Sequence, residues 1–279
     1  MKKSSIIFVS VTAVVMVALL IGIILLEPHE SGDITETMKD AVLHENDKID
    51  FLGLKVNPGF ISALITTVIV VVFAAVVRIF AIPRFKLQPG KFQLLIETIV
   101  NFFDSLAKQN SPHRNGFLGA YIFAAGIYIF VSTLLELIGL QWVAASGESV
   151  TLGAPLADIN AAIALGVLSY LVILSGGIAS NGFVGAGRTL KEFSLPISMS
   201  FRLFGALLSG LLVTELVYHF IALSFVLPVV VGVLFTLLHA LIQTYVLVML
   251  TSLFYGEVTE PKKKKAKKSK SGAVAAASK

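Results

Sequence analysis

Long apolar runs alternate with shorter polar segments along most of this 279-residue chain. A run of about twenty apolar residues is long enough to cross the hydrocarbon core of a bilayer as a helix. The pattern therefore predicts an all-α integral membrane protein with about five to six membrane helices, the last two of them the longest. The apolar runs fall at residues 1–26, 59–82, 117–140, 159–181, 192–220 and 225–256.

Residues 85–107 follow a different pattern. Apolar residues recur at helical spacing between Phe92 and Leu106, and Glu97 and Asp104 interrupt them. This alternation predicts an amphipathic helix that lies along the membrane surface. A spanning helix is disfavoured because the apolar run is too short.

Charge divides the polar segments between two sides of the membrane. Residues 27–58 hold eight Asp or Glu against three Lys, and residues 141–158 hold no basic residue. Six Lys or Arg lie between residues 78 and 114, and others lie at the N-terminus, at residues 188 and 191, and in the C-terminal tail. Because basic loops stay in the cytoplasm, both termini are predicted to be cytoplasmic, with residues 182–191 as a short cytoplasmic loop.

Four parts of the chain follow from these patterns. The first apolar run is expected to be a retained anchor, since signal-peptide cores are usually shorter, although a cleaved signal peptide remains the alternative. The parts are an N-terminal hydrophobic segment at 1–26, an acidic extracytoplasmic segment at 27–58, a membrane domain at 59–256, and a Lys-rich cytoplasmic tail at 257–279.

Composition agrees with a membrane protein and removes several other classes. Hydrophobic residues make up 56% of the chain and charged residues 14%, against roughly 45–50% and 25% in soluble domains. The absence of Cys excludes disulfides and thiolate metal sites, and no metal or other cofactor is predicted. Eight Lys lie beyond residue 260, so the net charge of +5 describes a tail and does not predict nucleic-acid binding.

One charge interrupts the fifth apolar run, where Arg202 stands within "ISMSFRLFGALLSG". A guanidinium stays protonated in proteins, and a charge at bilayer depth costs several kcal/mol, so such a residue is a functional candidate. Small residues on the same helix face follow it and would let another helix approach closely. These small residues are Gly205, Ala206, Ser209 and Gly210.

The ionic partner of Arg202 is not obvious within the chain. The nearest acids along the sequence, Glu192 and Glu215, would lie roughly 15 and 20 Å away on a straight helix. We therefore expect the partner to come from another chain, in preference to a structural ion pair inside the bundle.

Other polar residues fall in or beside the apolar runs. His239 and Gln243 are one helical turn apart, and a His can carry a proton near neutral pH. His239 is equally compatible with a proton relay and a structural role, and Gln243 alone would be assigned to packing. Glu215 would line a water path or lie at the outer interface with His219. Glu136, Asp158 and Asn160 stand near the outer ends of the third and fourth spans.

Several motifs occur together in a familiar order. "PISMSFRLFG" and the small residues after it resemble the hallmark segment of subunit a of F-type ATP synthases. "PLADIN" resembles the family's Pro-x-x-Asp-x-Asn motif, "KEFSLPIS" its Glu-Phe-Ser-x-Pro lead-in, and "LIQTYVLVMLTSLFY" its final helix. The likeness extends over roughly residues 57–256.

The resemblance implies a function and a set of roles. Arg202 matches the essential arginine that faces the carboxylates of a rotating c-ring, and Gln243 matches the glutamine beside it. Two aqueous half-channels would couple H⁺ flow, or alternatively Na⁺ flow, to rotation and ATP synthesis. The last two helices would pack against the ring. The implied ion path comprises Glu136, Asp158, Asn160, Glu192, Glu215, His239 and Gln243.

The implied partners are the c-ring oligomer, subunit b of the peripheral stalk, the remaining ATP synthase subunits and the lipid bilayer. The chain would bind no nucleotide and would not be an enzyme by itself. A bacterial plasma membrane is expected, since the chain carries no Arg- and Ser-rich transit peptide.

The chain departs from the family pattern at four positions. Ala206 replaces a common Asn, and Leu195 replaces a Lys found in some members. Glu215 lies thirteen residues after the Arg, where nine is usual, and His239 lies four before the Gln, where seven occurs. Both shifts keep roughly the same helix face.

Two other functional classes stay open on the sequence. A secondary ion-coupled transporter would also embed Arg, Glu and His, but it would need a midplane site with broken helices, and no Gly- or Pro-interrupted pair is visible. A structural membrane scaffold leaves Arg202 unexplained. Co-purification with a c-ring would separate the three.

Overall fold

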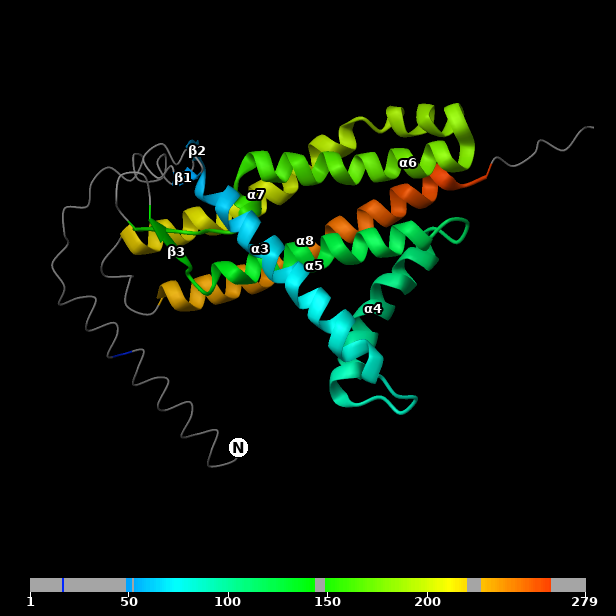
Figure 1. The fold of residues 1–279 in the computed structure, drawn as a ribbon. Helices are drawn as coiled ribbons and strands as arrows, with labels where there is room; N and C mark the ends of the chain where they lie inside the picture. The colour runs from blue at the N-terminus through cyan, green and yellow to red at the C-terminus, as the bar shows by residue number, and fades with distance from the viewer. Residues whose placement is uncertain (1–16, 18–48, 52, 144–148, 220–226, 262–279) are drawn as a thin grey trace, which may run out of the picture.

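The described part of the chain is built almost entirely from helices, as the apolar pattern predicts. The computed structural model describes residues 17, 49–51, 53–143, 149–219 and 227–261 (Figure 1). The N-terminal apolar segment, most of the acidic segment and the Lys-rich tail lie outside these residues. The helices are α3 (Pro58–Val76), α4 (Lys91–Asn110), α5 (Gly116–Glu136), α6 (Ile159–Lys191), α7 (Ser194–His219) and α8 (Leu227–Thr259).

Four described segments are long and apolar enough to cross a membrane, and they make the chain a multi-pass membrane protein. They are Pro58–Arg84, Gly116–Glu136, Ile159–Lys191 and Gly232–Thr259. Large apolar side chains on α3 point outward, with Val71 59% and Phe73 55% exposed, as expected of a surface that faces lipid. The total of five to six membrane helices stays a prediction.

Four helices form the centre of the molecule. α5, α6, α7 and α8 run side by side, and α3 and α4 cross them obliquely (Figure 1). α7 and α8 form an antiparallel pair, and α8 also packs against α5 and α6. Two buried apolar clusters fill the bundle, one around Ile122, Ile173 and Val248, the other around Ile129, Leu203 and Leu247.

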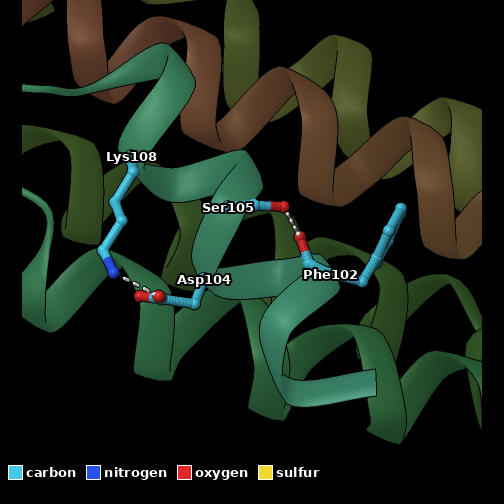
Figure 2. Close-up of polar contacts among 4 residues, drawn as sticks. All are labelled: Phe102, Asp104, Ser105 and Lys108. Atoms are coloured by element: carbon cyan, nitrogen blue, oxygen red, sulfur yellow. Dashed lines mark hydrogen bonds and ion pairs between the residues drawn. The ribbon is translucent and has the colours of Figure 1, made fainter. Parts of the chain in front are cut away.

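The amphipathic helix is confirmed, but it begins six residues later than the predicted segment. α4 starts at Lys91, because the Pro89–Gly90 pair delays helix formation. Its buried residues Phe103 and Ala107 face α5, whereas Asp104 and Lys108 form an exposed ion pair at 2.5 Å (Figure 2). In the same turn, the Ser105 hydroxyl donates to the Phe102 carbonyl at 2.8 Å (Figure 2). That α4 lies along the membrane surface stays a prediction.

The predicted loop conformation of residues 182–191 is wrong, since these residues are helical, and their cytoplasmic location stays a prediction. α6 breaks at Gly182, which has φ 58° and ψ −139°, a left-handed conformation that favours glycine. The chain then returns as a short helical arm against the first arm of α6. The Tyr170 hydroxyl donates to the Thr189 carbonyl at 3.1 Å and ties the two arms together.

Two small antiparallel hairpins were not predicted. β1 (Ile49–Phe51) pairs with β2 (Leu54–Val56), and β3 (Gln141–Val143) pairs with β4 (Ser149–Thr151). The first hairpin leads directly into α3, and the second lies between α5 and α6. The Ile49 side chain packs with Ile61 and Leu152, so the hairpins help to seat the starts of these helices.

Candidate functional site

Arg202 lies on an open face of α7. Its neighbours Met199 and Leu203 are buried against the bundle, whereas Arg202 itself is exposed. Among the described residues, the Arg202 side chain forms no ion pair and no hydrogen bond. The charge therefore remains available to a group outside this chain.

The small residues after Arg202 differ in exposure, with two on the open surface and two half-buried. Gly205 and Ser209 are exposed, and a Cβ added at Gly205 would meet no atom within 4 Å. Ala206 and Gly210 are half-buried, and Gly210 faces His239 of α8. The exposed pair leaves a smooth surface beside the guanidinium, which a second helix could approach closely.

α8 brings His239 and Gln243 to the same region. A Cβ added at Gly210 would lie 3.5 Å from Nδ1 of His239, so the imidazole packs directly against this glycine. Because α7 and α8 are antiparallel, Gln243 lies one turn, about 5–6 Å, from His239 back toward the level of Arg202. The sequence-predicted Arg, His and Gln thus gather on adjoining stretches of two helices.

Gln243 is buried without a full set of hydrogen bonds. Its side chain is 6% exposed, and its Oε1 has no hydrogen-bond partner among the described residues. The hydroxyls of Thr244 and Thr251 on the same helix share this property. An unsatisfied buried acceptor costs roughly 1–3 kcal/mol, so these atoms favour a polar occupant such as water along α8.

The acidic candidates lie at both ends of the bundle. Glu136 ends α5, is half-buried, and makes no side-chain hydrogen bond or ion pair with any described residue. Glu192 lies at the junction of α6 and α7, at the opposite end, and is half-buried as well. Glu215 belongs to α7, but its side chain falls outside the described part of the chain.

Asp158 has a clear structural role. Its Oδ1 accepts a hydrogen bond from the Asn160 backbone N–H at 2.8 Å and so caps α6. Its Oδ2 accepts from Nδ2 of Asn57 at 3.0 Å, which joins the start of α6 to the start of α3. The Asn160 side chain is exposed, and only its backbone takes part in this contact.

We expect Asp158→Ala to lower the free energy of unfolding by about 1 kcal/mol or more, because a helix cap and a bond between helices are both lost. Thermal unfolding of the purified protein in detergent would measure this. Asn160→Ala is the matched control and should be nearly neutral, since it keeps the backbone donor. Equal stability of the two variants would contradict the capping role.

A polar clamp that the sequence patterns did not reveal holds the end of α8. Nδ2 of Asn181 donates to the carbonyls of Val258 and Glu260, at 2.9 and 3.1 Å. Nη1 of Arg188 donates to the Glu260 carbonyl at 3.1 Å. Hydropathy cannot predict these bonds, because their acceptors are backbone carbonyls more than seventy positions away.

Comparisons with known proteins identify the family of the chain. A family described as "ATP synthase A chain" matches residues 60–256. A protein of Beijerinckia indica named ATP synthase subunit a is 25% identical over 255 residues, covering 84% of this chain and 98% of its own. A Haemophilus influenzae protein of the same name is 25% identical, covering 72% and 90%. A Histophilus somni relative, also so named, is 28% identical over 60% of this chain and 75% of its own. The matched region holds Arg202, His239 and Gln243, and the chain belongs to the ATP synthase A chain family.

Proposed function

We propose that this subunit couples H⁺ flow across a bacterial plasma membrane to rotation of a c-ring, and thereby to ATP synthesis. The observation that carries the proposal is an Arg202 side chain that is exposed, unpaired among the described residues, and flanked by small residues. An embedded charge is costly in lipid, and a carboxylate supplied by a neighbouring subunit would offset that cost.

In this mechanism Arg202 attracts a ring carboxylate only when that group is ionised. The attraction favours ion release as each carboxylate arrives, and the fixed charge stops an ion from passing directly between two half-channels. The membrane potential supplies about 2.3 kcal/mol per charge per 100 mV. Gly205 and Ser209 leave room for ring helices to slide past.

The outer half-channel is assigned to His239 and Gln243, with Glu215 and Glu136 toward its opening. The unsatisfied oxygen of Gln243 and the hydroxyl of Thr244 support a hydrated path along α8. Glu192 would serve the cytoplasmic side. Asp158 and Asn160 are assigned to positioning α6 beside this path, because both carboxylate oxygens of Asp158 are engaged.

The subunit would work only within a complex. Its partners would be the c-ring oligomer against α7 and α8, subunit b of the peripheral stalk, and the remaining ATP synthase subunits. By itself it would catalyse no reaction. Co-purification of the tagged chain with a c-ring tests this assignment, and a chain that transports ions without any ring would overturn it.

His239→Ala and Glu215→Gln should slow ATP-driven pumping without producing a passive leak. Each residue would only keep water and ions near Arg202, so neighbouring groups and water replace part of its contribution. Pumping into vesicles, followed with a pH-sensitive dye, measures the rate. Leu241→Ala, at an exposed apolar position of α8, is the control and should pump normally. Normal rates in both path variants would place the outer channel elsewhere.

The transported ion is expected to be H⁺. ATP-driven transport should therefore be independent of added Na⁺ and should collapse when a protonophore is present. Measurement of the same vesicles with and without Na⁺ checks this. Na⁺ uptake that persists with the protonophore would identify Na⁺ as the coupling ion while leaving the role of Arg202 intact.

A further inference from the structure

A second site lies away from Arg202, where α3 ends and α4 begins. A cavity of about 710 Å³ opens there between the C-terminal half of the Pro58–Arg84 span and residues 85–93. In Figure 1 this corner stands apart from the central bundle, joined to it by α3 and α4. Neither the ion path nor the c-ring surface uses it.

The cavity has one apolar wall and one cationic rim. Phe73, Val77 and Phe80 of the spanning segment supply apolar surface, and Phe80 is 57% exposed. The rim holds three exposed cations and no acidic residue, and none of the three forms an ion pair among the described residues. These cations are Arg84, Lys86 and Lys91.

Local structure fixes this rim in place. α3 passes into a wider π-helical turn at Val77–Ala81 and then a tight turn that contains Pro83, so the chain reverses sharply at the end of the span. Gln93 then holds the connecting segment. Its Oε1 accepts from the Lys86 N–H at 3.0 Å, and its Nε2 donates to the Lys86 carbonyl at 2.9 Å.

The nearest acid does not neutralise the rim. Oε1 of Glu97 accepts a hydrogen bond from Nε2 of Gln93 at 2.7 Å, and it forms no ion pair with the three cations. Gln93 thus stands between the carboxylate and the cavity. The site keeps a positive charge beside an apolar wall at the end of a membrane span.

We infer that this cavity binds an anionic phospholipid, with the phosphate on Arg84, Lys86 and Lys91 and an acyl chain along Phe73, Val77 and Phe80. Basic pockets between membrane helices on the cytoplasmic side recognise anionic headgroups in this way. Charge complementarity and the position at the end of a span favour a lipid over a soluble phosphate, because only a lipid would contact the cationic rim and the apolar wall together.

Photo-crosslinking of the assembled ATP synthase in phosphatidylcholine vesicles tests the inference. The vesicles would carry a minor fraction of photoreactive phosphatidylglycerol or, in the parallel arm, photoreactive phosphatidylcholine. We expect the phosphatidylglycerol probe to label peptides within residues 73–93, and the phosphatidylcholine probe to label them at least about fivefold less, since one basic contact is worth about that factor.

Two charge-matched variants make the test specific. Arg84→Gln with Lys86→Gln should lower labelling by about tenfold or more, because two headgroup contacts are lost. Lys108→Gln with Lys191→Gln also removes two exposed cations, but outside the cavity, and should keep the labelling. Both variants should still assemble with the c-ring. A negative labelling result would therefore count against the lipid site and not against the proposed coupling role.

Three outcomes would overturn the lipid site. Equal labelling by both probes would show an apolar surface without headgroup recognition. Undiminished labelling of the Arg84 and Lys86 variant would exclude the cationic rim. A photoreactive residue can also replace Phe92, which lines the cavity and is half exposed. If it cross-linked to another subunit in place of lipid, the cavity would belong to a protein partner.

Discussion

Arg202→Ala should abolish ion-driven ATP synthesis while the subunit remains assembled in the membrane. The side chain is exposed on α7 and makes no contact that holds the bundle together, so its removal relieves an embedded charge and leaves the core intact. Synthesis by inverted vesicles under an imposed proton gradient, and the amount of subunit that co-purifies with the ring, measure the two effects.

Without the fixed charge, ions should also exchange passively through the ring with no net rotation. Passive proton flux in vesicles made without nucleotide would therefore rise in Arg202→Ala. Ser209→Ala is a suitable control, since it changes an exposed residue of the same face and loses only a hydrogen bond to the Ala206 carbonyl. Coupled synthesis by the Arg202→Ala complex would remove the central element of the proposed mechanism.

Arg202→Lys keeps a positive charge at this position but replaces the guanidinium with an ammonium. The ammonium is a compact, strongly hydrated charge, and desolvation lowers its pKa far more readily than that of a guanidinium. A Lys would lose its proton part of the time at bilayer depth, and the barrier would then open. We expect coupled synthesis to fail in this variant as well, with a smaller passive leak than in Arg202→Ala.

Hydropathy predicted the spans because the bilayer imposes a length on each apolar run. The observed bounds of α5, α7 and α8 lie within about four residues of the predicted runs, and α3 reaches the end of its run through a π-helical turn. The Arg202 face was readable in part: Gly205 and Ser209 share its exposed side, as residues three and seven apart on a helix should, whereas Ala206 and Gly210 are half-buried. The same rule located His239 and Gln243 on a single face of α8, and the structure sets His239 against Gly210.

Contacts between distant parts of the chain were not readable in this way. Asp158 was assigned to the ion path by resemblance, and its hydrogen bond with Asn57, 101 residues earlier, could not be predicted from local patterns. The helical arm at residues 183–191 resembled a loop because Gly182, Gly185 and Gly187 break helices in isolation. Tertiary packing overrides that preference. Gly182 has a positive φ, and Gly185 packs closely against Gly177, and a local sequence pattern reveals neither requirement.

Gly185→Ala should be among the most damaging small substitutions outside the ion path. The returning arm of α6 approaches the first arm so closely that a Cβ on Gly185 would overlap the Gly177 carbonyl oxygen and lie 2.5 Å from the carbonyl carbon. Backbone cannot move aside as a flexible side chain can. Core overpacking typically costs about 1–3 kcal/mol, and a clash with backbone should reach or exceed the top of that range.

The damage should spread to function because the returning arm leads directly into α7. If the arm cannot fold back, the Thr189 carbonyl loses its bond from Tyr170, and the start of the helix that carries Arg202 is displaced. We expect Gly185→Ala to reduce both the level of subunit in the membrane and the melting temperature of the purified complex. Gly187→Ala is the matched control: it lies in the same arm, a Cβ there meets no atom within 4 Å, and Ala favours a helix by about 1 kcal/mol. If the two alanines behaved alike, the close packing of the two arms of α6 would be ruled out as the reason for the glycine.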